Sequence, residues 1–380
     1  MEFLFLSSLW GVTYPVFIYP TILFFVGLFK DKTIKRDENL LPSVSLIIPA
    51  YNEEKIIREK IENTLGLNYH KERLEIIVAS ESNDRTNTIV QEYEKDGVLL
   101  YSYEKREGKS SLLYKTVPKA RGEIILFSDA DVIYKKDAIK KLVRNFADNS
   151  IGAVSGRLVY INPQGTIAGE GESVYWGYEM LLKRLSSKIS SVIGASGSIY
   201  AIRKELYLPL DINRGDDFEI PTMIAIKGYR SILEEEAMAY ARASDSSEDE
   251  FKRKVRIVSW FIRSGVILIK EGIKNKRWLI VFQILSHKFS RWFMPIWLIS
   301  FFVSNLLLFN KGLLLRYLFI MQISFYLIAL YGWVCEKRMI NIKPILSIPY
   351  FFVVVNYATF CGIWRFINGT GERVTWEKTR

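Results

Sequence analysis

Two pairs of acidic residues have the types and the spacing to do chemistry. Asp129 and Asp131 follow a run of large apolar residues at 124–127, and Asp216 and Asp217 stand at a predicted helix start. Carboxylates at positions i and i+2 that avoid the core supply oxygen ligands for Mg²⁺ or Mn²⁺, which in turn hold phosphate oxygens. Each pair also has an ordinary interpretation, as a strand end before a solvated turn or as dipole partners of a helix N-terminus. The surrounding elements decide between these interpretations.

The apolar run at 124–127 predicts a strand that is buried on both faces, and such strands belong to parallel sheets covered by helices. Similar strand signals at 44–48, 74–79 and 98–103 each precede a polar turn and a helix. Strands that alternate with helices predict βαβ units and a mostly parallel, doubly wound α/β sheet.

Four polar residues fall just after these strands or at the helix starts that follow: Asp84, Lys109, Asp129 and Asp131. The carboxyl ends of parallel strands share one edge of the sheet, and ligands of such sheets bind there. We therefore expect these side chains to converge where a nucleotide would bind. The next part of the chain is less regular, with an aromatic-rich helix predicted at 172–185.

The composition excludes several other kinds of site. The chain has 380 residues, 49% of them hydrophobic, and a formal net charge of +11. Its two cysteines, Cys335 and Cys361, lie in apolar stretches, so the sequence offers no disulfide framework or zinc spacing. His70 and His287 are too few and too far apart for a histidine metal site or a Ser-His-Asp arrangement. The positive charge clusters beside apolar segments, which favours a membrane surface over nucleic acid.

The first apolar segment, residues 3–29, is long enough to cross a bilayer, for which about 20 apolar residues suffice. A secretory signal peptide is the alternative, but it would have a basic start and a shorter apolar core. Four basic residues follow the segment directly: Lys30, Lys32, Lys35 and Arg36. The positive-inside tendency therefore places the next domain in the cytoplasm.

The C-terminal third alternates amphipathic and apolar segments. Residues 245–263 and 277–291 combine basic and apolar residues at helical spacing, which is typical of helices in the membrane interface. Apolar segments at 292–309, 313–334 and 345–364 are each near the spanning length. One span before the domain and three after it would place the C-terminus outside, whereas the basic tail predicts the opposite. A re-entrant segment would resolve this conflict.

Taken together, several motifs resemble those of family 2 glycosyltransferases, most closely the membrane-integrated cellulose, chitin, hyaluronan and poly-N-acetylglucosamine synthases. They occur in the family's order, as Pro49-Ala50-Tyr51-Asn52-Glu53-Glu54, Asp84, Gly108-Lys109, Asp129-Ala130-Asp131, Gly197-Ser198, Asp216-Asp217 and Arg253-Lys254-Val255-Arg256. No single motif is specific, but their order between membrane segments is. The resemblance covers residues 41–269 by motif and the flanking spans by layout.

The resemblance implies a GT-A nucleotide-sugar fold, a UDP-sugar donor, Mg²⁺ or Mn²⁺, and inversion at the anomeric carbon by direct displacement. The nucleotide-sugar residues that it implies are Ala50, Tyr51 and Glu53 at the base, Asp84 at the uridine, Lys109 near base or phosphates, Asp129 at the ribose, Asp131 at the metal, and Arg253. It implies Asp217 as the general base and Arg256 as a cation on the leaving phosphates, which a guanidinium grips bidentately. Trp176, Gly197, Ser198 and Asp216 would contact the acceptor.

With this resemblance, the chain divides into five expected parts. They are a transmembrane helix at 1–30, a cytosolic GT-A domain at 31–244, amphipathic interfacial helices at 245–291, three transmembrane helices at 292–366 and a basic tail at 367–380. We therefore expect a multi-pass protein of the cell membrane whose catalytic domain is cytoplasmic and whose partners are a lipid bilayer, a nucleotide sugar and an acceptor, with no nucleic acid.

One departure from the family keeps the acceptor open. The processive synthases carry Q-x-x-R-W where this chain has Arg253-Lys254-Val255-Arg256-Ile257, so the arginine is kept and the glutamine and tryptophan are missing. The tryptophan is associated with holding the acceptor sugar, although Trp260 follows one helical turn later. Synthesis of a polysaccharide or oligosaccharide and transfer of one sugar to a polyprenyl (dolichyl) phosphate or other lipid-linked acceptor both remain possible.

Two further classes of function are less consistent with the sequence. A membrane receptor or transporter subunit that only binds nucleotide would not need both acidic pairs. A nucleic-acid binder would show a readout motif, whereas here the basic residues alternate with apolar ones.

Overall fold

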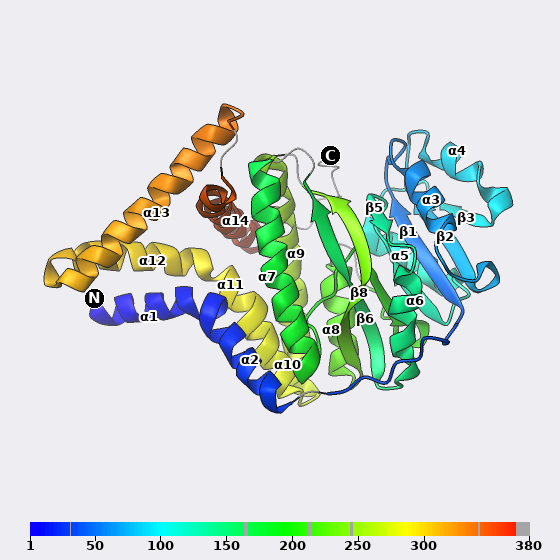
Figure 1. Ribbon diagram of the computed structural model, residues 1–380, viewed down its shortest axis with the longest axis horizontal. Helices are drawn as coiled ribbons and strands as arrows, with labels where there is room; N and C mark the ends of the chain where they lie inside the picture. The colour runs from blue at the N-terminus through cyan, green and yellow to red at the C-terminus, as the bar shows by residue number, and fades with distance from the viewer. Residues whose placement is uncertain (31, 163–165, 211–213, 244–245, 341–342, 370–380) are drawn as a thin grey trace.

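The computed structural model describes residues 1–30, 32–162, 166–210, 214–243, 246–340 and 343–369. A single eight-stranded sheet forms its centre, in the order β3-β2-β1-β4-β7-β6-β8-β5. The strands are β1 Val44–Ala50, β2 Leu74–Ser80, β3 Val98–Ser102, β4 Ile124–Phe127, β5 Val132–Tyr134, β6 Ile151–Ile161, β7 Tyr200–Arg203 and β8 Arg230–Arg242. Helices cover both faces, and a group of apolar helices extends from one side (Figure 1).

The first half of the sheet is parallel, because β1 pairs with β2 and β4 and β2 pairs with β3 in that sense. Strand β1 continues to Ala50, past the expected end at Pro49. Its pairing with β4 stops at Ile47, so Pro49 lies beyond that pairing. A proline lacks the N–H that a ladder requires and is tolerated where a neighbouring strand has ended.

The second half of the sheet is mixed. Strand β7 pairs antiparallel with both β4 and β6, β5 pairs antiparallel with β8, and β6 and β8 run parallel. The expected mostly parallel sheet therefore holds for β1 to β4, and antiparallel strands complete it. A buried ion pair anchors this half, since Arg144 Nη2 lies 3.0 Å from Glu234 Oε2.

Helices lie on both faces of the sheet and enclose two apolar cores. On one face, α3 and α6 pack against β5 and β8, and on the other α5 packs against β1 and β2. Their bounds are α3 Ile57–Leu65, α4 Thr86–Gln91, α5 Lys109–Thr116, α6 Ala138–Val143 and α8 Asp216–Ile226. Because α4, α5 and α8 begin just after strands or loops at the same edge, their first residues face one region.

Two long helices connect the sheet to the apolar part of the molecule. They are α7 Ile167–Ile189 and α9 Ser247–Lys274. Helix α9 packs against α8, and α7 packs against β6, β8 and α2. The helix predicted at 172–185 lies within α7, and α9 contains residues 247–263 of the amphipathic segment predicted at 245–263, whose first residue lies outside the described ranges.

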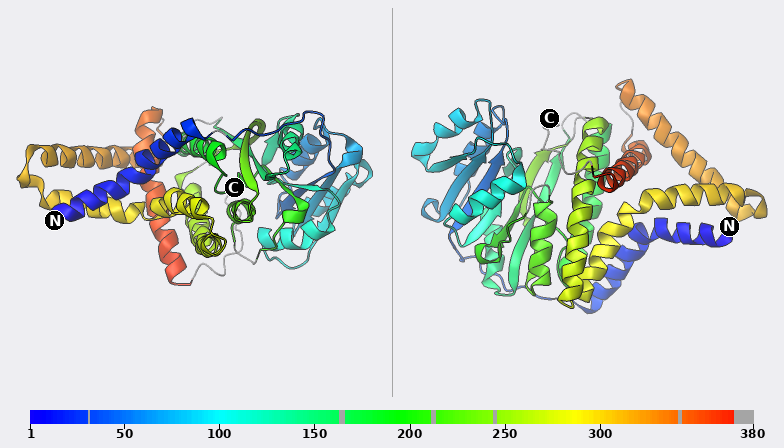
Figure 2. Two further views of the ribbon diagram at one scale, coloured as in Figure 1. Left: turned by 90° about the horizontal axis from the view of Figure 1, so that it is seen from below. Right: turned by 180° about the vertical axis from the view of Figure 1, so that it is seen from behind.

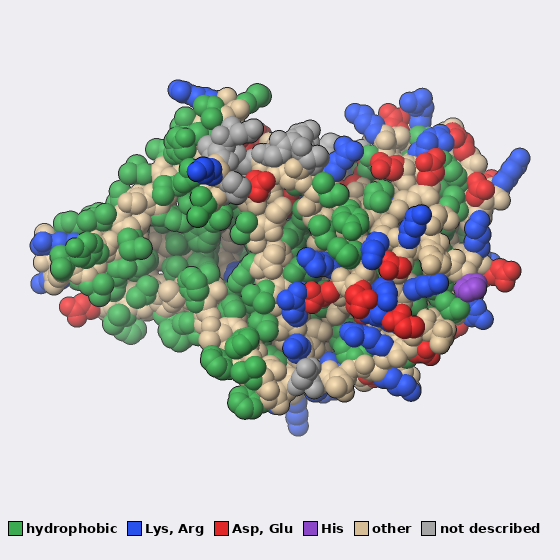
Figure 3. Space-filling view, in the orientation of Figure 1, with side chains coloured by type: hydrophobic (Ala, Val, Ile, Leu, Met, Phe, Trp, Pro, Cys, Tyr) green, Lys and Arg blue, Asp and Glu red, His purple; other side chains and the backbone are tan. Residues whose placement is uncertain are grey.

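The remaining helices form the apolar part. They are α1 Glu2–Thr13, the π-helical segment η1 Tyr14–Ile18, α2 Tyr19–Phe29, α10 Trp278–Ile284, the π-helical segment η7 Leu285–Phe289, α11 Ser290–Trp292, α12 Met294–Leu307, α13 Leu313–Lys337 and α14 Pro344–Ile367. Helices α1, α12 and α13 extend away from the sheet, and two further views show the same arrangement (Figures 1 and 2). Hydrophobic side chains dominate the surface of this part, whereas charged ones gather over the sheet domain (Figure 3).

Within the residues that the structure describes, three helices are long and apolar enough to cross a membrane, at Glu2–Phe29, Leu313–Lys337 and Ile345–Ile367. The segment expected at 292–309 instead forms the shorter α12, which continues the bent helix that begins with α10. The boundary expected at 244–245 and most of the tail expected at 367–380 lie outside the described residues.

Candidate active site

Lys109 and Asp129 are paired at the edge of the sheet. Lys109 begins α5, Asp129 follows β4, and Lys109 Nζ donates to Asp129 Oδ1 over 2.9 Å. Ser198, from the loop before β7, donates its hydroxyl to Asp129 Oδ2 over 2.7 Å. Both oxygens of Asp129 are therefore held by side chains from two other elements.

The second acidic pair closes the same group of side chains. Asp216 begins α8 and is 6% exposed, and it accepts a hydrogen bond from the Tyr200 hydroxyl over 2.9 Å. Lys109 Nζ lies 3.6 Å from the same carboxylate. Asp217 is adjacent to the small-residue loop, because a methyl group added to Gly197 would lie 3.0 Å from Asp217 Oδ2. The predicted Lys109, Asp129, Gly197, Ser198, Asp216 and Asp217 thus meet in one place.

The pKa values of the Asp129 and Asp217 carboxylates are shifted in opposite directions. Burial acts to raise the pKa of Asp129, but the Lys109 ammonium and the Ser198 hydroxyl outweigh it and hold the pKa below its ordinary value. Burial raises the pKa of Asp217 to about 6, and the neighbouring Asp216 adds to this shift. Asp129 is therefore a fixed anion, whereas Asp217 can take up a proton near neutral pH, as a general base requires.

A small cavity beside Lys109 ends at Tyr51. It measures about 20 Å³ and is lined by Pro49, Tyr51, Glu81, Arg106, Gly108, Lys109, Leu112 and Asp129. The Arg106 guanidinium lies over the Tyr51 ring, 3.8 Å from its centre. A cavity of this size holds about one water molecule.

Glu81 is a buried carboxylate at this cavity, 3% exposed, directly after β2. Its Oε2 accepts a hydrogen bond from the Gly108 N–H over 2.9 Å, and its Oε1 has no hydrogen-bond partner within the described part of the chain. Burial raises the pKa of Glu81 above its ordinary value. An unpaired buried oxygen of this kind is suited to a ligand N–H.

Two loops meet beyond Tyr51, where Asp84 organises the backbone. Its Oδ2 accepts from the Glu54 N–H over 3.2 Å, and its Oδ1 accepts from the Thr86 N–H over 2.9 Å. The Thr86 hydroxyl in turn accepts from the Glu53 N–H over 2.8 Å. Asp84 and Glu53 thus join the ends of β1 and β2, and Ala50 is buried beneath them.

Asp131 is the exposed member of its pair. Across the described ranges, no group of three or more His, Cys, Asp or Glu side chains stands ready to hold a metal ion. Mg²⁺ is commonly bound through one or two carboxylates together with substrate phosphates. One exposed carboxylate beside an anion already held by a lysine fits a metal that arrives with a diphosphate.

The basic segment of α9 carries two arginines that have different contacts. Arg253 contacts the carboxylates of Glu172 and Glu250, and its Nη1 donates to the Tyr160 hydroxyl over 3.1 Å. Arg253 thereby links α7, α9 and β6, away from the Lys109 group. Arg256 lies over the Trp260 ring at 5.8 Å.

Two cations, the buried Lys183 and the half-buried Lys288, lie near enough to Asp217 to act on its charge. Lys183 on α7 is 2% exposed and donates to the Ser196 hydroxyl over 3.1 Å, with its Nζ 5.4 Å from the Trp176 ring. Glu179 accepts from Lys288 Nζ over 3.3 Å and from Arg291 Nη1 over 2.7 Å. These cations hold the pKa of Glu179 well below its ordinary value, against the effect of burial.

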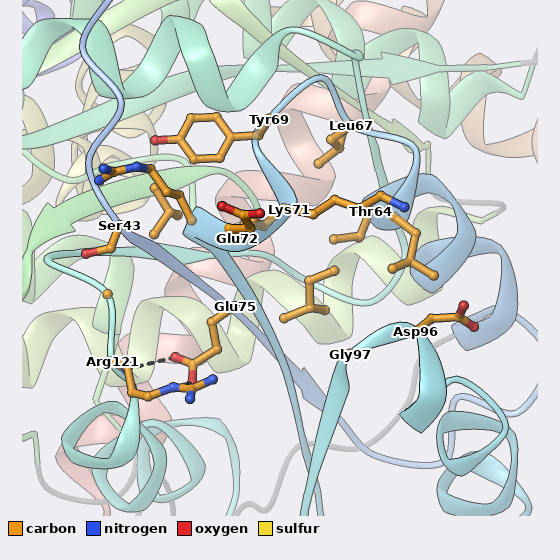
Figure 4. A pocket seen from close by; sticks show the side chains of 16 residues that line it. Ser43, Thr64, Leu67, Tyr69, Lys71, Glu72, Glu75, Asp96, Gly97 and Arg121 are labelled. Carbon is orange, nitrogen blue, oxygen red and sulfur yellow. Dashed lines mark hydrogen bonds and ion pairs between the residues drawn. The ribbon is translucent and has the colours of Figure 1, made fainter.

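A second cavity lies at the opposite edge of the sheet. It measures about 450 Å³ and is lined by the beginnings of β1 and β2 and by residues just before β3 and β4 (Figure 4). Arg121 Nε donates to Glu75 Oε1 over 2.7 Å at its rim. None of the predicted site residues lines this cavity, so it is separate from the candidate active site.

Sequence reasoning missed three side chains of the site. Glu81 could have been found, because it directly follows a predicted buried strand. Tyr200 and Lys183 gave no such signal, since a tyrosine in a strand and a lysine on a helix usually belong to ordinary packing and surface.

Comparisons with known proteins agree with this geometry. Residues 45–208 match the family model "Glycosyl transferase family 2". The chain is 25% identical over 363 residues to the probable glycosyltransferase YdaM of Bacillus subtilis (strain 168), covering 88% of this chain and 84% of that protein. It is 22% identical over 293 residues to the poly-beta-1,6-N-acetyl-D-glucosamine synthase of Staphylococcus aureus (strain COL), covering 73% and 69%.

A solved structure supports the fold. The mannosyltransferase PcManGT from Pyrobaculum calidifontis, in complex with GDP-Man and Mn²⁺, matches with a TM-score of 0.75 at 20% sequence identity, covering 96% of this chain and 98% of that chain. The family resemblance seen in the motifs and the expected GT-A fold are confirmed.

Proposed function

We propose that this chain, a glycosyltransferase with a family 2 domain over residues 45–208, is a multi-pass membrane enzyme that uses a UDP-sugar. It transfers the sugar to a glycan acceptor, with inversion at the anomeric carbon, on the cytoplasmic face of the membrane. The relative that makes poly-beta-1,6-N-acetyl-D-glucosamine supports a polysaccharide or oligosaccharide product. The metal is Mg²⁺ or Mn²⁺, held by Asp131.

One observation carries the proposal. Lys109 pairs with Asp129 and lies 3.6 Å from Asp216, while Asp217, the next residue, adjoins Gly197. Residues far apart along the chain thus bring together Lys109, the carboxylate of Asp129, which we assign to the donor, and the carboxylate of Asp217, whose pKa is raised. Two carboxylates of different pKa in one site are the arrangement that separates a binding anion from a base.

The reaction follows from these positions. Asp217 accepts the proton of an acceptor hydroxyl, whose oxygen forms the new bond to the anomeric carbon. The bond from that carbon to the diphosphate breaks, and its electron pair leaves with the nucleoside diphosphate. A bound metal would neutralise the charge that develops on the diphosphate, and Lys109 and Arg256 add positive charge on the protein side.

The base of the nucleotide would bind between Tyr51 and Glu81. Glu81 Oε1 is a buried acceptor without a partner among the described residues, so it can accept an N–H of the base. Uracil and guanine both offer such an N–H, and PcManGT was solved with GDP-Man. A panel of nucleotide sugars, scored by metal-dependent release of nucleoside diphosphate, distinguishes a UDP-sugar donor from a GDP-sugar donor.

The main test is Asp217→Asn in detergent-purified protein. Loss of the base is expected to lower transfer by about 10²–10⁴, while the Kd for the nucleoside diphosphate stays close to that of the wild type. Asp96→Asn, at an exposed position, is the matched control and should leave both quantities unchanged. Equal loss of binding and transfer in Asp217→Asn would remove Asp217 from the role of base.

A second candidate function is transfer of one sugar to a polyprenyl phosphate. The observation that favours it is the group of cations near Asp217, in which the half-buried Lys288 and Arg291 contact the Glu179 carboxylate. Such a group suits an acceptor that carries an anion. A single sugar on a solvent-extractable lipid would support this candidate, and a polymer of many sugars would reject it.

A further inference from the structure

Lys60 is a fully buried lysine beneath the turn that carries Asp129 and Asp131. It lies on α3 with 0% of its surface exposed. Its Nζ donates to the Ser128 hydroxyl over 2.6 Å and to the Val132 carbonyl over 2.6 Å. The ammonium also lies 4.3 Å from the centre of the Tyr134 ring. Its two hydrogen bonds are therefore directed at residues that flank the two aspartates.

The two hydrogen bonds hold the turn at both ends, because Ser128 precedes Asp129 and Val132 follows Asp131. One helical turn later on α3, Asn63 adds two more hydrogen bonds on the same strand. Its Nδ2 donates to the Tyr134 carbonyl over 3.0 Å, and its Oδ1 accepts from the Tyr134 N–H over 2.8 Å. Helix α3 thus clamps β5 and the turn that leads into it.

The charge of Lys60 is unusual for a structural residue. In the part of the chain that the structure describes, no carboxylate lies within 4.0 Å of its Nζ; burial lowers the pKa of Lys60 to about 7, and Asp129 and Asp131 act in the opposite direction. Burying an ammonium without a paired carboxylate is costly, and an apolar residue of similar volume fills such a position more favourably. A role in holding the turn that carries Asp129 and Asp131 accounts for a lysine at this position.

We propose that Lys60 is a positioning residue that sets the Asp129–Asp131 turn for the metal-bound diphosphate. The inference rests on the proposed function, since it assigns Lys60 to the same donor site. It acts through backbone and side-chain neighbours of the aspartates and touches no substrate.

The clamp extends from the turn to the acceptor side. The Tyr134 hydroxyl, whose ring face lies against the Lys60 ammonium, shares its one hydrogen between the Phe127 carbonyl at 3.2 Å and the Ser198 carbonyl at 3.0 Å. Ser198 in turn holds Asp129. Displacing Lys60 therefore disturbs the metal site and the loop beside Asp217 together.

The test compares Lys60→Met with the wild type by Mn²⁺ titration in the presence of UDP or GDP, followed by electron paramagnetic resonance. Loss of a group that orients a metal ligand typically lowers metal affinity about 10–100-fold, and we expect a rise of this size in the Mn²⁺ Kd. The KM for the donor should rise with it, while the melting temperature shows that the protein is folded. Lys95→Met removes an exposed lysine and should change none of these values.

Ser128→Ala keeps the test decisive where Lys60→Met does not fold, because it deletes one partner of Lys60 and leaves the lysine in place. It is expected to raise the Mn²⁺ Kd several-fold. A folded Lys60→Met or Ser128→Ala protein whose Mn²⁺ Kd stays within twofold of the wild type would overturn the positioning role. A wild-type protein that binds no Mn²⁺ with either nucleotide would overturn the proposed function as well.

Discussion

Asp217 is the side chain whose protonation should set the pH dependence of the reaction. Its pKa is raised to about 6, chiefly by burial. A base must be ionised, so we expect kcat to rise with pH through about 6 and to level off above it. A pH–rate profile with saturating donor and acceptor measures this midpoint. A profile that stays flat down to pH 4.5 would contradict the assignment.

Substitution of Lys183 gives a second test of the pKa of Asp217. Its positive charge lowers the pKa of Asp217, and its own pKa, lowered by burial to about 8, leaves it protonated at pH 6. Lys183→Met should therefore move the acidic midpoint of the profile upward. A role confined to packing would lower the melting temperature without moving that midpoint.

At the scale of residues, the sequence located the acidic and basic side chains but not their partners. Asp129, Lys109 and Asp217 follow predicted strands or start predicted helices, and strand ends gather at one edge. The Asp129–Ser198 hydrogen bond depends on the antiparallel strand β7, which the hydrophobic pattern of the sequence did not predict. The buried partners Lys60 and Lys183 have the residue type of a surface and could be placed only by tertiary structure.

At the scale of elements, the loop before β7 must approach the start of α8 closely. A methyl group at Gly197 would lie 3.0 Å from Asp217 Oδ2, which is tighter than ordinary packing. We expect Gly197→Ala to displace the base by a few tenths of an ångström and to lower kcat by less than the roughly 10²-fold that a displacement of about 1 Å can cost. Initial rates with saturating substrates and a melting curve measure the two effects separately.

Gly177 on α7 supplies the matched control for this prediction. No atom lies within 4 Å of a methyl group placed there, and the residue is exposed. Gly177→Ala should stabilise the helix by about 1 kcal/mol, the difference in helix propensity, and leave kcat unchanged. Equal activity of Gly197→Ala and Gly177→Ala would mean that Asp217 is not constrained by the loop.

The elements also differ in how well they could be predicted. Strands β1 and β4 are apolar runs buried on both faces, and their sequence shows it. Strand β8 includes Glu234, which is 2% exposed and pairs with the buried Arg144. A buried ion pair looks like a surface pattern in the sequence, so the second half of the sheet was missed.

At the scale of the whole molecule, we propose three membrane crossings, by α1–α2, by the bent helix α10–α12 and by α13. The bent helices α1–α2 and α10–α12 run side by side away from the sheet domain, and α13 returns toward it (Figure 1). The return is anchored, because Glu336 near the end of α13 accepts a hydrogen bond from the Ser247 N–H at the start of α9 over 3.0 Å. Three such crossings would place the N-terminal end of α1 and the C-terminal end of α13 on opposite sides of the bilayer.

Helix α14 has the length of a span but lies across this junction. It packs against α9 and α7, and Figure 1 shows it nearly end-on beside them. Phe251 on α9 and Tyr357 on α14 are in ring contact, with centroids 5.4 Å apart. From this position we propose that α14 is a re-entrant segment rather than a fourth span, which would resolve the parity conflict in the sequence.

The basic residues agree with this topology. One basic cluster follows α2 and consists of Lys30, Lys32, Lys35 and Arg36. A second lies at the end of α13 and before α14, and consists of Lys337, Arg338 and Lys343. Three crossings place both clusters on one side, which the positive-inside tendency makes the cytoplasm. We expect green fluorescent protein fused after Arg380 to fluoresce and alkaline phosphatase at the same point to be inactive. Alkaline phosphatase inserted after Asn310, between α12 and α13, should be active, because that turn is on the far side.

The competing topology makes the opposite prediction at one of these points only. If α14 crossed the bilayer as a fourth span, the phosphatase after Arg380 would be active and the insertion after Asn310 would be unaffected. Activity at both points would therefore place α14 through the membrane and separate it from α7 and α9. Because α9 carries Arg256 and packs against the helix that begins with Asp216 and Asp217, that result would also change which surface encloses the acceptor.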